Sequence, residues 1–542
     1  MPQRASTLAP FRNPQFRILW SATLASNLGG LVQGVGAGWM MTTLSQSHDL
    51  VALVQASTTL PIMIFSLAAG ALADNYDRRR IMIVAQVFMM VTSFALAACG
   101  WMGWLTPWLL LTFTFLIGCG TALYNPSWQA SMGDIVTRED LPGAVTLNGM
   151  GFNLMRSVGP AVGGIIVSLA GAAAAFIVNA FSYLPLIAAL TLWKPNRPER
   201  TLPREDFASA MSAGLRYVAM SPNLLRVIFR SFIYGFGAVS LLALMPVVAS
   251  DLLQGNALVF GILLGCFGLG AIGGAFVNAR IREVLSNEWI VRYSFIGYGL
   301  SCILLAQSEY VWLSLLLLLP AGMCWVLALS LFNVTVQLST PRWVVGRALA
   351  LYQTATFGGM AAGSWVWGVL SDEVDPRFAL SCAGILLFVG ALVGLRYTLP
   401  AFGSLNLDPF NHFNEPALRL DLKPRSGPIM VMIDYNIAQK DIPAFLAAMT
   451  DRRRIRIRDG ARQWALLRDL ENPETWTESY HVPTWLEYVR HNQRRTYEDQ
   501  KVWETLRNLH QGTDAPRVHR MIERQTVPPT ENIPIKQNPV VP

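Results

Sequence analysis

A short loop within the first hundred residues concentrates charge in an otherwise apolar region. It reads Gly70-Ala-Leu-Ala-Asp74-Asn-Tyr-Asp77-Arg78-Arg79-Arg80. A carboxylate at a helix end can accept hydrogen bonds from the first amides of a neighbouring helix or pair with an arginine, and a glycine allows helices to approach closely. We interpret Gly70, Asp74, Arg78 and Arg79 as a conformational latch. The alternative is that the arginines only orient the flanking helices.

A second group lies inside a later apolar run, which reads Arg156-Ser-Val-Gly159-Pro160-Ala-Val-Gly163-Gly164. Pro160 can kink a helix, and the glycines allow tight packing across the kink. An arginine within an apolar span costs at least about 2.5 kcal/mol, so we expect a cavity or a partner for it. Arg156 either meets an anionic substrate or helix carbonyls in a central cavity, or it braces the helices through Asn125 or Gln129. The sequence leaves both open.

Acidic residues of this apolar region lie near the ends of the runs, among them Asp74, Asp134, Glu139, Asp140, Asp251 and Asp372. Proton-coupled carriers commonly use a buried carboxylate whose pKa is set by burial, and the sequence places none of these acidic residues in the middle of an apolar run.

Six cysteines lie singly in apolar runs, without a CxxC pair, which is typical of packing residues. We expect no metal site, no cofactor and no nucleotide loop.

The elements that position these residues follow from the uneven distribution of charge. Residues 401–542 hold 38 of the 76 charged residues, so the first 400 residues are poor in charge. A helix that crosses a bilayer needs about 20 mostly apolar residues. This pattern excludes a single soluble globule and predicts twelve transmembrane helices in the runs 16–44, 50–73, 80–102, 105–130, 143–170, 172–193, 222–252, 256–279, 287–307, 310–338, 343–371 and 376–399.

Lysine and arginine gather in alternate loops of this region. Sixteen of these residues fall on one side and only Arg377 on the other, and such an excess marks the cytoplasmic side. We therefore expect an integral, multi-pass protein of the plasma (bacterial inner) membrane with both termini in the cytoplasm. A basic, proline-containing linker at 194–221 separates a six-helix bundle at 1–193 from a second at 222–400.

The two halves share a pattern, because Gly274-Ala-Phe-Val-Asn278 closes the eighth run as Gly70–Asp74 closes the second. The first copy resembles the signature loop of the major facilitator superfamily, which Gly70, Leu72, Asp74, Arg78 and Arg79 match; Asp77 replaces a common glycine. Asn278 replaces the aspartate in the second copy. The resemblance implies a secondary transporter that works by alternating access.

The segment at 159–164 resembles the Gly-Pro-x-x-Gly-Gly motif of exporters and antiporters in this superfamily. Residues 125–160 are similar to the branch of enterobactin exporters, or transmembrane secretion effectors. This resemblance implies efflux, with proton antiport. By superfamily geometry the cavity would be lined by Asn27, Gln33, Asn125, Gln129, Arg156, Tyr234, Asn333 and Gln337. Amides beside aromatic residues suit a small amphipathic organic substrate, siderophore- or drug-like.

The pattern changes after residue 400. We expect a linker at 401–427, an α+β domain at 428–524 and a disordered proline-rich tail at 525–542. Strands are predicted at 428–437, 463–469, 475–482 and 517–522, and helices at 441–454, 484–495 and 497–510. This order indicates a ferredoxin-like unit. The basic run Arg452–Arg458 is interpreted as a solvated helix face, with contact to anionic lipid as the alternative.

This domain looks similar to the dimeric barrel family that includes antibiotic-biosynthesis monooxygenases. The resemblance implies dimerisation through the domain, and it raises a membrane-anchored enzyme or a ligand sensor as alternatives to transport. Trp464, Trp476, His481 and Trp485 would line an enzymatic pocket, although such aromatic residues are more often core. We prefer a regulatory or dimerising module attached to a transporter. The expected partners are a small-molecule substrate and the lipid bilayer, and no nucleic acid.

Overall fold

The computed structural model describes residues 8–137, 140–194, 207–341, 343–400, 407, 410, 415–512 and 514–523. The predicted tail at 525–542 and much of the predicted linkers at 194–221 and 401–427 lie outside these residues, as do Glu139 and the Asp74 side chain. The chain divides into two compact units. The first contains Met1–Phe207, Leu225–Val336 and Leu349–Ala401, and the second contains Ala208–Leu224, Gln337–Ala348 and Phe402–Pro542.

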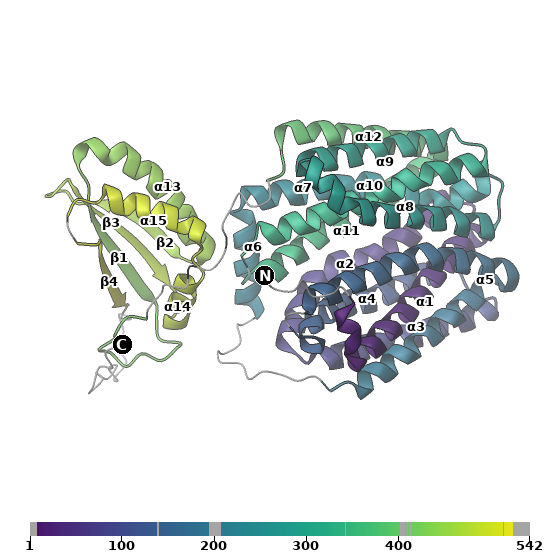
Figure 1. Ribbon diagram of the computed structural model, residues 1–542, viewed down its shortest axis with the longest axis horizontal. Helices are drawn as coiled ribbons and strands as arrows, with labels where there is room; N and C mark the ends of the chain where they lie inside the picture. Colours follow the sequence, from purple (N-terminus) through teal and green to yellow (C-terminus); the bar gives the residue numbers. More distant parts are fainter. Residues whose placement is uncertain are drawn as a thin grey trace. The chain divides into compact units, whose positions relative to one another are not determined.

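The first unit is built of long helices that run side by side (Figure 1). A short 3-10 helix, η1 (Ala9–Arg12), precedes them, and a π-helical turn, η2 (Val248–Leu252), follows α7. The long helices are α1 (Pro14–Leu44), α2 (His48–Asn75), α3 (Arg78–Trp101), α4 (Pro107–Ile135), α5 (Leu141–Leu192), α7 (Pro222–Val247), α8 (Ala257–Val284), α9 (Asn287–Ala306), α10 (Val311–Leu338), α11 (Val345–Glu373) and α12 (Pro376–Arg396).

Nine helices of the described chain are long and apolar enough to cross a bilayer, which confirms a polytopic, mostly helical protein. They lie within α2, α3, α4, α5, α7 with η2, α8, α9, α10 and α12. Helix α5 is long enough for two crossings, and its backbone leaves helical geometry at Gly171 (φ 82°, ψ 169°). That conformation favours glycine, and it falls between the predicted runs 143–170 and 172–193. The count of twelve stays a prediction.

Local sequence explains where several of these helices begin. The side chain of Asn13 accepts a hydrogen bond from the Gln15 amide at the start of α1, and Asp77 accepts from the amides of Arg79 and Arg80 at the start of α3. Asn256 does the same for α8. Such side chains satisfy amides that have no partner within the helix. Asp77 is therefore a helix cap, a role that sequence reasoning did not assign to it.

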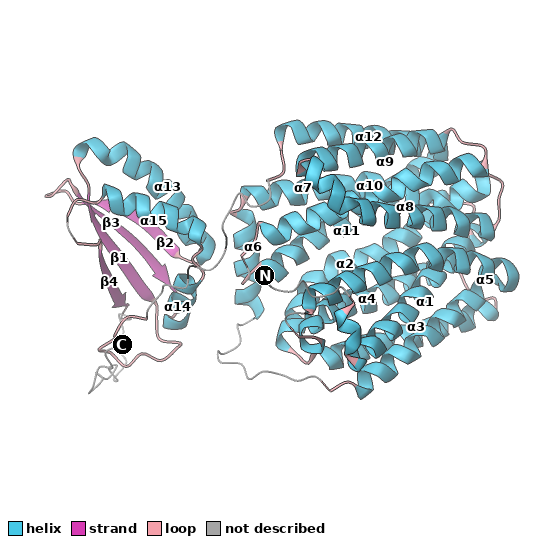
Figure 2. Ribbon diagram, in the orientation of Figure 1, coloured by secondary structure: helices cyan, strands magenta, loops and turns pink. Residues whose placement is uncertain are grey.

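The second unit contains the strands, which Figure 2 draws in magenta. They are β1 (Ile429–Asn436), β2 (Arg462–Arg468), β3 (Thr475–Val482) and β4 (Arg517–Ile522), and they form an antiparallel sheet in the order β2-β3-β1-β4. Its helices are α6 (Phe207–Ala219), α13 (Ile442–Asp459), α14 (Trp485–Gln493) and α15 (Tyr497–Leu509), with a 3-10 turn, η3 (Gln439–Asp441). Helices α13 and α15 lie on one face of the sheet (Figure 1).

Alternation along β1 builds the core of this sheet. Ile429, Val431, Ile433 and Tyr435 are buried, and their neighbours in sequence are less so, as expected when one face of a strand packs against helices. Phe445 and Met449 of α13 join the same core. The sheet thereby fixes the position of every side chain on its helix-covered face, including Glu478 of β3.

Helix α13 differs from its prediction, because it continues through the basic run to Asp459. Arg452 and Arg456, one turn apart, are only 3% and 2% exposed. Their Nε atoms lie 3.5 and 3.0 Å from the carboxylate oxygens of Glu478, which is itself fully buried. The interpretation of the whole run as a solvated helix face is therefore wrong, because a buried carboxylate on the sheet draws two of its arginines inward.

Candidate functional site

The glycines of α5 lie at close helix crossings. A Cβ atom placed on Gly164 would lie 2.9 Å from the Cα atom of Gly261 in α8, and one on Gly163 would lie 3.1 Å from the Cα atom of Val32 in α1. One on Gly268 of α8 would lie 2.5 Å from the Cα atom of Ser157. Helix α5 therefore packs backbone to backbone against helices from both halves of the sequence, a contact that side chains would prevent.

Arg156 lies on the same helix, beside this crossing. Its guanidinium carbon is 5.6 Å from the ring centre of Phe267 in α8 and 5.3 Å from that of Trp325 in α10. Cations at this distance from an aromatic ring are attracted by its electron-rich face. Within the described chain Arg156 has no carboxylate partner and no hydrogen bond to Asn125 or Gln129. The arginine thus reaches from the first half of the sequence to the second without a neutralising acid.

Aromatic side chains enclose the region that Arg156 reaches. The Trp325 ring lies 6.1 Å from Tyr298, 6.0 Å from Phe267 and 6.4 Å from Tyr234 of α7, measured between ring centres. Two of their polar atoms, Trp325 Nε1 and Tyr234 Oη, are buried and have no hydrogen-bond partner in the described chain. Buried polar atoms are usually paired, so this cluster holds unused hydrogen-bonding capacity beside an unpaired cation.

The remaining predicted cavity residues lie in varied surroundings. Gln33 is buried, and its Oε1 accepts hydrogen bonds from Ser93 Oγ at 3.1 Å and from Asn179 Nδ2. Asn27 and Asn333 are half-buried, whereas Asn125, Gln129 and Gln337 are exposed. Gln33 therefore joins α1, α3 and the second part of α5. Its predicted contact with substrate, like that of the other residues, stays a prediction.

The charged loop of the predicted latch is bonded within the first five helices. Arg78 Nη1 donates to the Ala130 carbonyl oxygen at 2.8 Å and to Asp134 Oδ2 at 3.1 Å, both in α4. Arg79 Nε donates to the Leu190 carbonyl oxygen at 2.7 Å, at the end of α5. These bonds hold α3, α4 and α5 together as one body.

The Asp74 side chain lies outside the described part of the chain, and no described atom approaches within 4 Å of a Cβ atom placed on Gly70. Close helix approach is therefore not the reason for glycine at position 70 in this conformation. In the matching place of the second half, Asn278 Nδ2 donates to Ser330 Oγ of α10 at 3.3 Å.

A polar cluster that sequence reasoning missed joins the two halves at the end of the helices away from this loop. His48 Nε2 lies 2.9 Å from Asp251 Oδ2, and the His48 amide donates to Asp372 Oδ1 at 2.9 Å. Ser47 Oγ donates to Asp372 Oδ2 at 3.1 Å. His48 is the one histidine of residues 1–400, which was the available signal. We call His48, Asp251 and Asp372 the outer clasp.

Replacing His48 by alanine should open this end of the helices. A hydrogen bond to a charged group is worth about 1.5–3 kcal/mol, so we expect the population open at this end to rise about tenfold or more. A cysteine at Ala52, which is buried beside Gly368, would report the opening through its rate of labelling by an impermeant maleimide. Thr42→Ala is the control, because the hydrogen bond that Thr42 makes in the described chain is to Trp39 of its own helix. Equal labelling rates in both variants would contradict this role.

A second missed network lies at the other end of the helices. Arg230 of α7 is fully buried, and its Nη1 lies 2.5 Å from Glu288 Oε2 at the start of α9. Arg292 Nε lies 2.7 Å from the other carboxylate oxygen. Arg230 is therefore another arginine within the apolar helices, so Arg156 is not the exception that its sequence position suggests. It differs from Arg156 in having a carboxylate partner.

The long apolar helices are those of a polytopic membrane protein, and comparison with known families decides which one. The family model described as transmembrane secretion effector matches residues 5–527. The chain belongs to this family, within the major facilitator superfamily. The match confirms the resemblance inferred from residues 70–80 and 125–164, and it makes the chain a transporter rather than an enzyme.

Curated relatives of this secretion-effector chain include exporters. The Enterobactin exporter EntS of Salmonella typhimurium is 25% identical over 404 residues, which cover 72% of this chain and 95% of the relative. The Multidrug efflux pump Tap of Mycobacterium tuberculosis is 23% identical over 423 residues, or 75% of this chain and 98% of the relative. The Staphyloferrin A transporter of Staphylococcus aureus is 23% identical over 52% of this chain and 70% of the relative.

Solved structures show the same fold for the secretion-effector chain. A bacterial homolog of the human lysosomal transporter Spinster, inward-facing and occupied, matches with a TM-score of 0.55 at 13% identity, covering 72% of this chain and 97% of that structure. An auto-inhibited peptide transporter of the POT family matches with a TM-score of 0.59 at 13% identity, covering 73% and 99%. At this identity the likeness establishes fold alone.

Proposed function

We propose that the protein exports a small aromatic organic anion across the plasma membrane by alternating access. The observation that carries this proposal is Arg156, which lies over the rings of Phe267 and Trp325 and has no carboxylate partner in the described chain. A charged side chain within a membrane-spanning helix is energetically costly, and such residues usually face a cavity, a substrate or a partner. The siderophore and drug exporters among the relatives support the direction of transport.

The surroundings of Arg156 favour this substrate class over sugars or inorganic ions. The rings of Tyr234, Tyr298 and Trp325 are buried in this conformation and would present flat apolar faces to a substrate when the helices part. The unused Trp325 Nε1 donates, while Tyr234 Oη donates or accepts. Arginine binds a carboxylate through two parallel hydrogen bonds. A substrate with an acidic group and an aromatic ring would satisfy all three features at once.

Alternating access needs two bodies that rock about this site. We propose twelve crossings in two six-helix bundles, 1–193 and 222–400, with α5 supplying the fifth and sixth. The outer clasp and the crossing of Gly164 with Gly261 join the bundles away from the basic loops. From the sixteen-to-one excess of basic residues we infer that those loops and both termini lie in the cytoplasm.

The latch stays part of this proposal. Arg78 and Arg79 hold α3–α5 as one body in the described state, and Asp74 would engage the other bundle when the cytoplasmic side closes. Asp74→Asn should then slow export, and wild-type export by this variant would exclude the latch.

Everted membrane vesicles test export and its coupling together. The resemblance of residues 159–164 to a motif of exporters and antiporters leads us to propose proton antiport, although the described part of the chain shows no carboxylate bonded to Arg156. Vesicles that contain the protein should accumulate an aromatic acid from an extract of the deletion strain, and a protonophore should abolish that accumulation. Accumulation that survives the protonophore would exclude proton coupling, and none in either condition would exclude export from the cytoplasm.

For residues 428–524 we propose a ferredoxin-like α+β domain in the cytoplasm. The strand order β2-β3-β1-β4, with helices on one face, supports that assignment. The opposite face carries half-buried or exposed methionines at 430, 432 and 521, and dimerisation through the domain would cover them. The mass of the purified protein by light scattering tests this, because a monomer would exclude it. The same domain as a ligand sensor is the second candidate function.

A further inference from the structure

A pocket in the second unit lies between the sheet and the helices that cover it. It has a volume of about 760 Å³. Its floor includes Val431, Ile433 and Tyr435 of β1 and Val518 and Arg520 of β4. Val431 pairs with Arg520, and Ile433 pairs with Val518. Helices α13, α14 and α15 supply the remaining walls. The pocket is large enough for a small organic molecule.

Four arginines line this pocket, namely Arg452, Arg456, Arg495 and Arg520, and its lining in the described chain includes no acidic residue. Behind the wall, Glu478 is the carboxylate bonded to Arg452 and Arg456. Arg495 bonds to the amide oxygen of Asn492, and Arg520 bonds to the Tyr488 hydroxyl. Four cations that share one carboxylate leave an uncompensated positive charge inside a partly enclosed pocket.

Glu478 has no bonding capacity left for a further cation. Its carboxylate accepts from Arg456, Arg452, Trp464 and the Tyr435 hydroxyl. Burial raises the pKa of Glu478, but Arg456 and Arg452 outweigh burial and bring this pKa to about 2. The carboxylate is therefore ionised at neutral pH and neutralises one of the two arginines, not both.

Arg456 retains unused hydrogen-bonding capacity, and the positive charge of Arg495 lies in unfavourable surroundings. Arg456 Nη2 is buried and has no hydrogen-bond partner in the described residues. Burial, together with the charges of Arg456 and Arg452, lowers the pKa of Arg495 to about 10, a shift that a bound anion would reverse. His491 adds no positive charge, because burial and Arg456 hold its pKa well below the ordinary value. Its Nε2 therefore accepts from Arg456 Nη1 at 2.9 Å.

Aromatic rings complete the pocket. Tyr480 lies under Arg456, with the guanidinium carbon 4.4 Å from the ring centre, and Tyr488 and Trp503 stand on other walls. We propose that this pocket binds a small organic anion that carries an aromatic ring, with its acidic group between Arg456 and Arg495. The acidic group of such a ligand would bind the guanidinium groups, and its aromatic ring would stack on the ring faces of the pocket.

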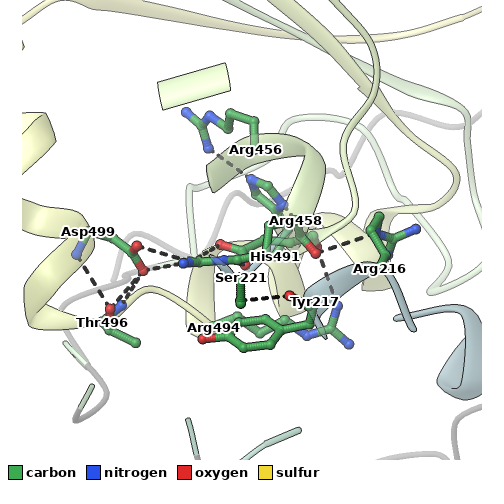
Figure 3. Close-up of polar contacts among 10 residues, drawn as sticks. Arg216, Tyr217, Ser221, Arg456, Arg458, His491, Arg494, Thr496 and Asp499 are labelled. Atoms are coloured by element: carbon green, nitrogen blue, oxygen red, sulfur yellow. Dashed lines mark hydrogen bonds and ion pairs between the residues drawn. The ribbon is translucent and has the colours of Figure 1, made fainter. Parts of the chain in front are cut away.

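Arg456 is fixed before the anion binds, and so are two neighbouring arginines, Arg458 and Arg494. Figure 3 shows Arg456 bonded to His491, whose Nδ1 donates to the Asp459 carbonyl oxygen at 3.3 Å. Arg494 donates to the same oxygen at 3.4 Å, and its guanidinium carbon lies 4.2 Å from the ring centre of Trp343. Arg458 is fixed by Asp499 and lies over Tyr217 of α6. Preorganised groups lose little entropy when a ligand binds.

Two of these contacts are made with residues next to the long helices. Trp343 and Tyr217 belong to the segments that lead in sequence into α11 and α7. The site itself does not depend on the proposed export function, because it lies within the second unit.

The test uses the full-length protein in lipid nanodiscs and the photoreactive anion 4-benzoylbenzoate, with uncharged 4-methylbenzophenone for comparison. We expect the anion to label the tryptic peptide 502–507, which contains Trp503, at least tenfold more than the neutral compound does. Arg495→Gln should lower that labelling about tenfold, since a charge-assisted hydrogen bond is lost. Arg495→Lys should restore part of it.

Two control variants separate this site from others. Arg453→Gln removes an exposed arginine of α13 outside the pocket, and Arg156→Gln disables the proposed transport site; neither should change labelling of peptide 502–507. If Arg495→Gln lowers the melting temperature, Arg520→Gln serves in its place. Equal labelling by the neutral compound, or labelling unaffected by loss of these arginines, would overturn the proposal. Labelling confined to α5, α8 or α10 would overturn it and still support the proposed function.

Discussion

Replacing Arg156 by glutamine should reduce export at least tenfold while the protein still reaches the membrane in normal amounts. The arginine has no carboxylate partner in the described chain, and it contacts Phe267 and Trp325 through its charge. Removing the charge therefore leaves no other ion unpaired, and it removes a costly cation from an apolar helix. The folded protein should tolerate the change, whereas an anionic substrate loses its counter-charge.

The readout is the cell's retention of the compound that the deletion strain accumulates, together with the amount of protein in the membrane. Arg156→Lys should keep part of the activity, since it retains charge but not the planar fork that binds a carboxylate. Arg80→Gln is a matched control, because Arg80 is exposed in the first turn of α3. Low protein amounts with unchanged export per molecule would instead show that Arg156 braces the helices.

Replacing Gly261 by valine should be as damaging, for a different reason. A Cβ atom at this position would lie 2.6 Å from the Pro160 carbonyl oxygen and 2.7 Å from the Cα atom of Gly164. Both are backbone atoms, so no side-chain movement can relieve the clash, and α5 and α8 must separate. The state closed at this end becomes unfavourable, and a carrier that cannot populate both states cannot complete its cycle.

We expect Gly261→Val to lower export at least tenfold and to raise maleimide labelling of a cysteine at position 52. Gly273→Val in the same helix is the control, because no described atom lies within 4 Å of a Cβ atom placed there. The control should export at close to the wild-type rate. Similar losses in the two variants would mean that any valine in α8 disturbs the protein, and the crossing would have no special role.

Residue types alone predicted a good part of this architecture. The spacing of Gly159, Gly163 and Gly164 indicated close helix packing, and the structure supplies Leu31, Val32 and Gly261 as the neighbours. Strands β3 and β4 have the predicted bounds. These features depend on periodicity and on small side chains, which are local properties of the sequence.

Contacts between residues that lie far apart in the sequence could not be predicted. His48 and Asp251 are 203 positions apart, and Arg230 and Glu288 are 58 apart. Neither pair carries a motif, so only the packing of α2 against α7 and α11, or of α7 against α9, brings them together. The basic run of α13 was misread for the same reason, since Glu478 lies on a strand that sequence periodicity does not place over Arg452 and Arg456. Gly70 is the opposite case. It belongs to a recognisable motif, but no described atom lies within 4 Å of a Cβ atom placed on it.

The most direct measurement compares the small molecules inside and outside cells that lack the protein with those in cells that regain it as wild type or as Arg156→Gln. Our account predicts that an aromatic acid accumulates inside the deletion strain, appears in the medium when the wild-type protein returns, and stays inside with Arg156→Gln. If no such acid changes compartment, or if the variant exports it as well as the wild type does, export of an organic anion through Arg156 is contradicted.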